Sequence, residues 1–304
     1  MTTATGAPSL HWPPLPLDEW QPTKDTLHLY AQMVGKVRLR LHPTLNHWWH
    51  TTLYVSPRGL TTHAIPYGGL SVELTLDLID HALRIATSQG QTSSIVLPGL
   101  TVAEVYARLC AALEDLGIRV AIDPRPYRHA SRIPFPDDRE HGAYDADYVR
   151  RFHDLLVAVD GMFKNFSGRV LGKQAPVHLF WHSFDLVLTR FSGRRAPPLE
   201  RGTRVDREGY THEVISFGFW PGDDWLREPA FYSYTYPEPE GLAAEPLRPE
   251  TAVWADHNGA LASLRYDDMA RSPDPASALL EFLERAYRAG ARRADWPIAE
   301  LTTP

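Results

Sequence analysis

The stretch that decides the fold is "VHLFWHSFDLVLTRFSG", residues 177–193, which is rich in β-formers and ends in a Ser-Gly turn. Further strand segments bounded by proline or glycine follow at 209–222 ("GYTHEVISFGFWPG") and 230–239 ("AFYSYTYPEP"). The segments "AVWAD" and "LASLRYD" flank an Asn-Gly pair that predicts a hairpin. Amphipathic helices are predicted on either side, at 144–166 and at 274–292, the second with Asp274 as its cap.

The first part of the chain shows the same order of elements. A helix is predicted over 23–37, with Thr23 as N-cap, and strands over 49–55 ("WHTTLYV"), 60–68, 70–79 and 82–88. A second helix fits 101–117, where Thr101 and Glu104 form a capping box and Gly117 ends the helix. In both parts, Trp-His followed by Ser or Thr is expected to open the first strand.

These patterns predict an α+β protein of two similar halves, each a helix, an antiparallel sheet and a helix, which suggests an internal duplication. The predicted segments are a proline-rich arm (1–20), the first half (21–123), a linker (124–143), the second half (144–296) and a tail (297–304). The prolines of the linker exclude long regular elements there.

Composition narrows the classes of function. The net charge of −6 argues against a nucleic-acid partner, because phosphate binding needs a basic surface. The single cysteine, Cys110, excludes an internal disulfide and a multi-cysteine metal site, and we expect it in the core. The N-terminus resembles no signal peptide and no stretch is long enough to span a membrane, so the cytoplasm is the expected location.

Several long motifs together resemble a bacterial family described as a domain of unknown function. They are residues 46–68, 172–198, 210–222 and 231–239, and the resemblance extends from about Trp20 onward. It implies no activity, because none has been assigned to that family. Two departures stand out: such proteins tend to read "FWGSFDL" where this chain has His182, and "EF-L-PYE" where it reads "ALASLRYDD". If that glycine lines a pocket, His182 partly fills it.

Polar residues within apolar strands are the candidates for chemistry, because burying them is unfavourable unless they are paired or used. The candidate catalytic residues are His47, His178, His182, His212, Glu213 and Asp185. Asp185 and Glu213 could instead be structural ion pairs, with Arg190, Arg194 or Arg58 as partners. Aromatic and basic residues could line a pocket for a ligand: Trp48, Arg58, Trp181, Arg190, Arg194, Trp220, Tyr232 and Tyr234.

Histidine spacing does not by itself predict a metal site. On a strand, His47 and His50 would face opposite ways, and His178 and His182 would lie ~13 Å apart. A metal is therefore only an alternative, with His47, His182, His212 and Glu213 as ligands drawn from separate strands. No cofactor is favoured, and the phosphate-binding, nucleophile-elbow and zinc-protease motifs are not found in the sequence.

The sequence thus predicts a small-molecule enzyme, or an enzyme-like binder, with a pocket near the junction of the halves for an anionic or aromatic ligand. Two alternatives stay open. One is a histidine-based metal-dependent protein. The other is a non-catalytic protein that binds a partner, with Pro13–Pro16 either as the interaction segment or as a tether over its own domain.

Overall fold

A computed structural model describes residues 10–302 of the chain. Its first half, together with the linker, contains two helices, two 3₁₀ turns and a six-stranded antiparallel sheet. The elements are α1 (Leu17–Leu41), η1 (Asn46–Thr51), β1 (Tyr54–Ser56), β2 (Gly59–Thr61), β3 (Ile65–Tyr67), β4 (Leu70–Asp77), β5 (Ala82–Thr87), β6 (Thr92–Val96), α2 (Val102–Asp115) and η2 (Phe135–Asp137). The strand order is β1-β2-β4-β5-β6, with β3 also pairing with β4.

The second half contains another six-stranded antiparallel sheet, in the order β11-β12-β10-β9-β8-β7. Its elements are α3 (Ala146–Ser167), β7 (His178–Phe180), β8 (Asp185–Arg195), α4 (Arg204–Gly209), β9 (His212–Trp220), β10 (Ala230–Tyr236), η3 (Leu242–Ala244), β11 (Val253–Asp256), β12 (Ala260–Arg265), α5 (Tyr266–Ala270), α6 (Pro275–Arg293) and α7 (Ile298–Leu301). The predicted α+β class with antiparallel sheets is confirmed, whereas a duplication stays a prediction.

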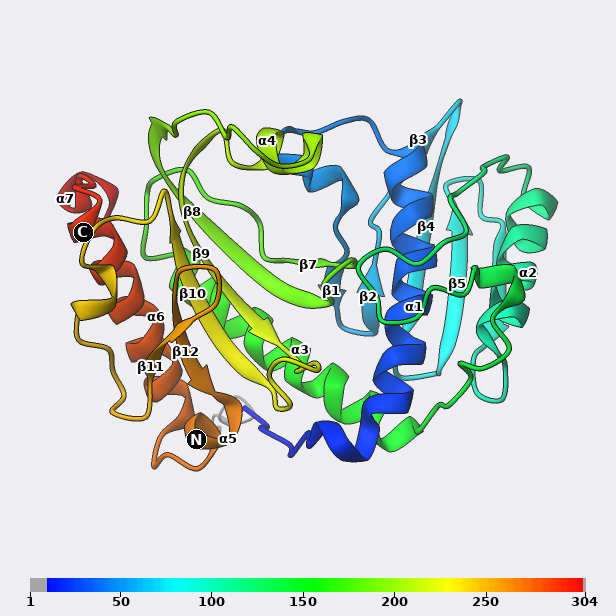
Figure 1. Cartoon of the computed structure of the whole chain (residues 1–304). Helices are drawn as coiled ribbons and strands as arrows, with labels where there is room; N and C mark the ends of the chain where they lie inside the picture. The colour runs from blue at the N-terminus through cyan, green and yellow to red at the C-terminus, as the bar shows by residue number, and fades with distance from the viewer. Residues whose placement is uncertain (1–9, 303–304) are drawn as a thin grey trace, which may run out of the picture.

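The two sheets meet edge to edge at β1 and β7, and α1 packs against β3 and β4 of the first sheet, over which it is drawn in Figure 1. Leu53, just before β1, and Leu179 of β7 exchange two backbone hydrogen bonds of 2.9 and 2.7 Å. Helix α3 contacts β1 of the first sheet and β8 of the second, so it spans the junction. On the far side of the second sheet, α6 packs against β9 and β10.

Helix α1 begins earlier than the sequence predicts. It starts at Leu17, includes Pro22 and buries Trp20 completely. Thr23 is not its cap; the Thr23 hydroxyl accepts a hydrogen bond of 3.0 Å from the Asp145 backbone N–H. Pro22 is the sixth residue of the helix, so it removes the hydrogen bond that the Asp18 carbonyl would otherwise accept. Burial of Trp20 in the preceding turn offsets this loss.

The predicted strand start at "WHTTLYV" is wrong. Residues 46–51 form the 3₁₀ turn η1, in which His47 and Trp48 have positive φ angles of 52° and 60°. The second Trp-His pair does not open a strand either, since Trp181 and His182 lie in the turn between β7 and β8. Within this turn the His47 ring lies 5.4 Å from the Trp49 ring, and the Trp48 ring stacks 5.2 Å from the His50 ring.

Cys110 is exposed, so the expectation of a core cysteine is wrong. The buried face of α2 includes Val105, Leu109 and Leu113, and Cys110 follows Leu109 by one residue, about 100° around the helix. The capping box of α2 is confirmed in both directions between Thr101 and Glu104.

The described part of the proline-rich arm lies over its own domain. The Tyr266 hydroxyl donates a 2.8 Å hydrogen bond to the Pro13 carbonyl, and the Trp12 ring lies 6.5 Å from Tyr266. Residues 1–9 of the predicted arm, and residues 303–304 of the predicted tail, lie outside the described residues. Between Leu10 and Thr302 no helix has the length and apolar character that a membrane span requires.

Candidate functional site at the junction of the halves

Three neighbouring cavities lie where α1, the linker and the second sheet meet. The largest, here called the polar cavity, measures about 620 Å³ and lies between α1 and the strands β8 to β10. The apolar cavity, of about 500 Å³, lies between α1, η1, the linker and α4. The connecting cavity, of about 220 Å³, shares wall residues with both. Volumes of this size suit small organic ligands.

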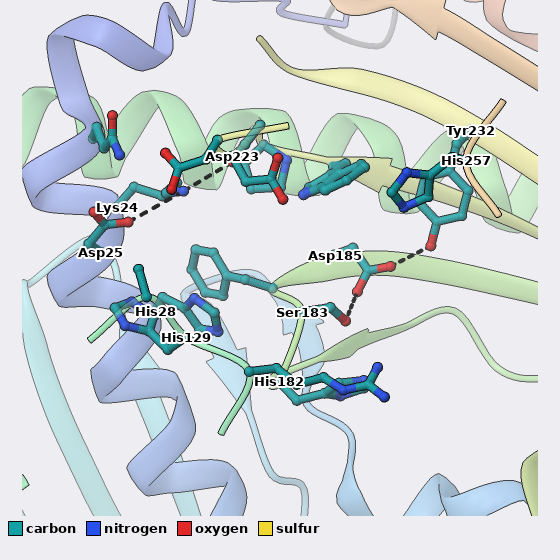
Figure 2. A pocket seen from close by; sticks show the side chains of 18 of the residues that line it. Lys24, Asp25, His28, His129, His182, Ser183, Asp185, Asp223, Tyr232 and His257 are labelled. Carbon is teal, nitrogen blue, oxygen red and sulfur yellow. Dashed lines mark hydrogen bonds and ion pairs between the residues drawn. The ribbon is translucent and has the colours of Figure 1, made fainter. Parts of the chain in front are cut away.

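Asp185 is the buried carboxylate of the polar cavity. It begins β8, directly after the turn 181–184, and its side chain accepts hydrogen bonds from the hydroxyls of Ser183 and Tyr232 (Figure 2). Across the described residues no basic side chain lies within 4.0 Å of this carboxylate. Phe184, which is buried, has a φ of 59°, an unfavourable conformation for a bulky residue. Such strain persists where the surroundings enforce it, and it is frequent at functional sites.

A glycine makes room for the phenol of Tyr232. Gly218 of β9 pairs with Tyr232 of β10 in the sheet register, and a methyl group added at Gly218 would lie 2.2 Å from the Tyr232 ring. The ring therefore lies flat across β9 and reaches Asp185 on β8. Burial, followed by the Asp185 charge, raises the pKa of Tyr232 well above its ordinary value, so its hydroxyl remains a donor at neutral pH.

Further hydroxyl groups extend across the same face of the sheet. The Tyr210 and Tyr234 hydroxyls lie 2.9 Å apart, and those of Thr189 and Ser216 lie 2.7 Å apart. The Tyr232 and Tyr234 rings are nearly parallel, with centroids 6.4 Å apart. This side of the sheet is consequently a polar wall built on strands, which holds its groups more rigidly than a loop would.

Helix α1 supplies the opposite wall of the polar cavity. The buried Lys24 ammonium donates a 3.0 Å hydrogen bond to the Gly222 carbonyl and lies 3.4 Å from the Asp25 carboxylate. His28 lies 2.9 Å from the Trp181 carbonyl, and burial lowers the pKa of its imidazole well below the ordinary value. His28 is therefore neutral at pH 7.

The linker forms the third wall. Gln32 of α1 holds it by bonds to both the N–H and the carbonyl of Tyr127, at 2.8 and 3.0 Å. The next residue, Arg128, has a φ of 51° and lines all three cavities. His129 follows, with its ring 5.0 Å from that of His28.

His182 also lines all three cavities, and it lies at the centre of the site. Burial lowers the pKa of His182, although the nearby Asp185 charge opposes that shift. Trp181, the residue before it, packs directly on α1, because a methyl group at Gly35 would lie 2.1 Å from the indole. Gly35 thus fixes the turn that carries His182 and Ser183.

Eight of the residues predicted from sequence line these cavities. They are His47, Trp48, Trp181, His182, Asp185, Trp220, Tyr232 and Tyr234. His212 lies beside them at the rim, with its ring 5.6 Å from His47 in an edge-on arrangement. The Nδ1 of His47 donates a 2.9 Å hydrogen bond to the Gly209 carbonyl.

His178 is buried away from the cavity walls. Its ring packs 4.7 Å from Phe180, and among the described residues neither ring nitrogen has a hydrogen-bond partner. Burial, with a smaller contribution from the Arg38 charge, lowers its pKa to about 3. It is a neutral core residue at pH 7.

The three arginines expected to hold an anion lie elsewhere. Arg58 pairs with Asp77 at 2.6 Å in the first sheet. Arg190 lies on the other face of the second sheet, where it donates to the Phe166 carbonyl and stacks over that ring at 3.5 Å. The pairing of Arg190 with Asp185 that the sequence suggested therefore does not form.

Arg194 pairs with Glu213 at 2.8 Å and also bonds to backbone carbonyls at the end of α6. Glu213 thus forms a structural ion pair, which was the alternative to its role as a catalytic acid. No group of three or more metal-ligating side chains gathers anywhere in residues 10–302, so the alternative ligand set His47, His182, His212 and Glu213 does not converge there.

Several cavity residues were not predicted: Lys24, Asp25, His28, Arg128, His129, Ser183, Asp223, Asp224 and His257. Ser183 carried a usable signal, because the polar residues Ser183 and Asp185 interrupt an apolar run. Arg128 and His129 carried none, because the position of an irregular linker depends on distant partners such as Gln32.

Comparison with known proteins identifies a family. Residues 12–303 match the family described as "Family of unknown function (DUF5996)". The chain belongs to this family. The match covers both halves, the linker and every cavity residue named above, so the family's defining region includes the whole site. No curated protein and no solved structure matches the chain.

Proposed function

We propose that this chain is an enzyme that binds a small organic molecule in the junction cavities and uses Asp185 as a general base. The observation that carries the proposal is the Asp185 carboxylate itself. It is buried at a cavity, it receives two hydroxyl hydrogen bonds, and within residues 10–302 it forms no ion pair.

A buried carboxylate without a cation is unfavourable, by an effective penalty of several kcal/mol before compensation. Two hydroxyl donors offset part of this penalty but occupy only part of the acceptor capacity, since a carboxylate has about four lone-pair sites. The remaining acceptor capacity is available to a ligand. A fold gains nothing from such an arrangement unless the carboxylate acts on a bound molecule.

The neighbours of Asp185 suit proton transfer. Tyr232 and Ser183 fix the carboxylate in one orientation, which is what a general base requires. His182 lies close enough for the Asp185 charge to affect its pKa, and burial keeps its imidazole neutral at pH 7. A neutral imidazole can accept the proton or return it to the product, so His182 is the proposed second proton carrier.

Incubation of the purified protein with a small-molecule cell extract tests this function. Compounds consumed by the wild type should be consumed at least ~100-fold more slowly by Asp185→Asn, because a lost general base costs about 10²–10⁴ in rate. Asp137→Asn is the matched control, since Asp137 is exposed and lines none of the three cavities. Mass spectrometry of the extract gives the rates.

Equal consumption by wild type and Asp185→Asn would contradict the proposal. Retention of a compound without its consumption would instead identify a non-catalytic binder, and would also count against Asp185 as a base.

A further inference from the structure

We infer that the ligand is an amphiphilic amine, with its protonated amino group at Asp185 and its hydrocarbon part in the apolar cavity. This inference rests on the proposed function, because it assigns a substrate class to the same site. Three observations support it: the charge balance of the polar cavity, the walls of the apolar cavity and the passage between the two.

Lys24 and the other three carboxylates of the polar cavity already have partners. Lys24 is neutralised by Asp25 and held by the Gly222 carbonyl. Asp223 accepts hydrogen bonds from two backbone N–H groups, and Asp224 lies 3.4 Å from Arg227. Asp185 is the buried charge that remains uncompensated within the part of the chain the structure describes. A protonated amine would neutralise the Asp185 carboxylate and donate hydrogen bonds to its remaining acceptor positions.

Arg128 does not reverse this balance. Arg128 is an exposed residue with its guanidinium 5.7 Å from the Tyr127 ring, whereas Asp185 is only 8% exposed. Water and salt screen an exposed charge more than a buried one. A buried charge dominates the choice of ligand, because its interactions are screened least. Three of the four histidines that line the polar cavity, His28, His129 and His182, have pKa values lowered by burial, so these three add no positive charge at pH 7.

The apolar cavity is walled mainly by hydrocarbon and aromatic side chains from five separate segments: Leu39, Trp48, Ile122, Phe180, Trp181 and Val205. Its buried cation, Lys36, is turned away to the carbonyls of Asp123 and Arg125, at 3.1 and 2.7 Å. Val205 of α4 lines this cavity and is 40% exposed, so its side chain is accessible to a ligand.

The connecting cavity joins the two. It shares Asp185 and Tyr232 with the polar cavity and Trp48 and Phe180 with the apolar cavity. A hydrocarbon chain that leaves an amino group at Asp185 can therefore reach the apolar walls by passing His182. Neither cavity alone would select an amphiphile, but the three together match one polar end and one apolar end.

Calorimetric titration with n-butylamine, n-hexylamine and n-octylamine at pH 7 tests the inference. Affinity should rise about fourfold for each added methylene that reaches the apolar walls, which makes octylamine up to roughly 200-fold tighter than butylamine. Octanoate, which has the opposite charge, should bind at least about tenfold more weakly than octylamine.

Two variants separate the two ends of the ligand. Asp185→Asn should remove the preference for octylamine over octanol while the dependence on chain length remains. Val205→Asp should do the reverse, so that butylamine binds normally and longer chains gain nothing. Leu171→Asp is the control, because Leu171 is 66% exposed and lines none of the three cavities. Circular dichroism melts establish that each variant is folded.

Any one of three results would overturn the inference: octanoate binds as tightly as octylamine, affinity does not depend on chain length, or Asp185→Asn binds octylamine as tightly as the wild type does. So would the absence of binding by all three amines. These results would leave the extract experiment unaffected. Conversely, amine binding with the predicted pattern but no Asp185-dependent consumption of any compound would contradict the proposed catalysis alone.

Discussion

The two halves of the molecule each bury one carboxylate in their sheet, and they treat it in opposite ways. Asp77, at the end of β4, is completely buried. It accepts hydrogen bonds from the side chains of Arg58 and Arg84 at 2.6 and 2.8 Å, and from the backbone N–H groups of Ile79 and Asp80 at 3.1 and 2.8 Å. Its charge and its lone pairs are both satisfied by the protein.

Asp185, at the start of β8, has two hydroxyl partners and faces a cavity. A carboxylate whose bonds are complete stabilises the fold and offers nothing to a ligand. A carboxylate whose bonds are incomplete lowers stability unless a ligand completes them. From this comparison we propose a structural role for Asp77 and a functional role for Asp185, and each proposal can be tested separately.

The largest expected effect is on turnover. With a compound that the wild type consumes, Asp185→Asn should slow consumption by about 100-fold or more. Asp77→Asn, measured at a temperature where it is folded, should stay within about twofold of wild type, because Asp77 does not line the cavities. Similar losses in both variants would remove the distinction between the two carboxylates.

The second effect is on stability. Asp77→Asn should lower the free energy of unfolding by about 2–3 kcal/mol in urea denaturation, because it removes the charge that pairs with two arginines. The value lies below that for a fully buried pair, since both arginines are about half exposed and screened by water. A loss below about 0.5 kcal/mol would show that Asp77 is not a structural anchor.

The third effect concerns His178, which was a catalytic candidate from sequence. Its pKa of about 3 in the fold lies below the ordinary 6.5, so the unfolded chain takes up the proton first. Its contribution to stability is complete above pH 6.5 and falls as the pH drops toward 3. Between pH 7 and 5, the wild type should lose about 2 kcal/mol more than His178→Leu. Free energies of unfolding measured in urea at pH 7 and pH 5 test this. An equal loss of stability in the wild type and in His178→Leu would contradict it.

The smallest effect is the acid sensitivity of Asp77. Burial alone would raise the pKa of Asp77, but hydrogen bonds from Arg58, the Asp80 backbone and Arg84 lower it to about 2, from 3.8. This stabilisation is present above pH 4 and declines as the pH falls toward 2. The difference in stability between wild type and Asp77→Asn should therefore shrink by about 1 kcal/mol from pH 5 to pH 3.

Regular elements could be predicted where local signals and burial agree. The capping box of α2, the Asp274 cap of α6 and the Asn-Gly hairpin between β11 and β12 were all foreseeable, because each depends on residues close in sequence. The left-handed residues His47, Trp48 and Phe184 were not, because neither periodicity nor propensity reveals a positive φ in a bulky residue.

The site was predictable in part for the same reason. Alternation along β10 placed Tyr232 and Tyr234 on one face, and the polar interruption in an apolar run marked Asp185. Arg194 pairs with Glu213, which was one of the predicted alternatives, whereas Arg58 and Arg190 do not pair with Glu213 or Asp185. The choice among several carboxylates depends on distances in space, which the sequence does not give. Arg58 and Arg84 converge on Asp77 only after β2, β4 and β5 have paired.

The free energy of unfolding of Asp185→Asn, measured in urea at pH 7 without ligand, tests the central claim most directly. Asparagine keeps the shape of the side chain and can still bond to Ser183 and Tyr232, but it removes the buried charge. If Asp185 is held for a ligand, the variant should be as stable as wild type or more stable, by up to about 1 kcal/mol. A loss of about 2 kcal/mol or more would make Asp185 a structural carboxylate like Asp77, and would contradict the account.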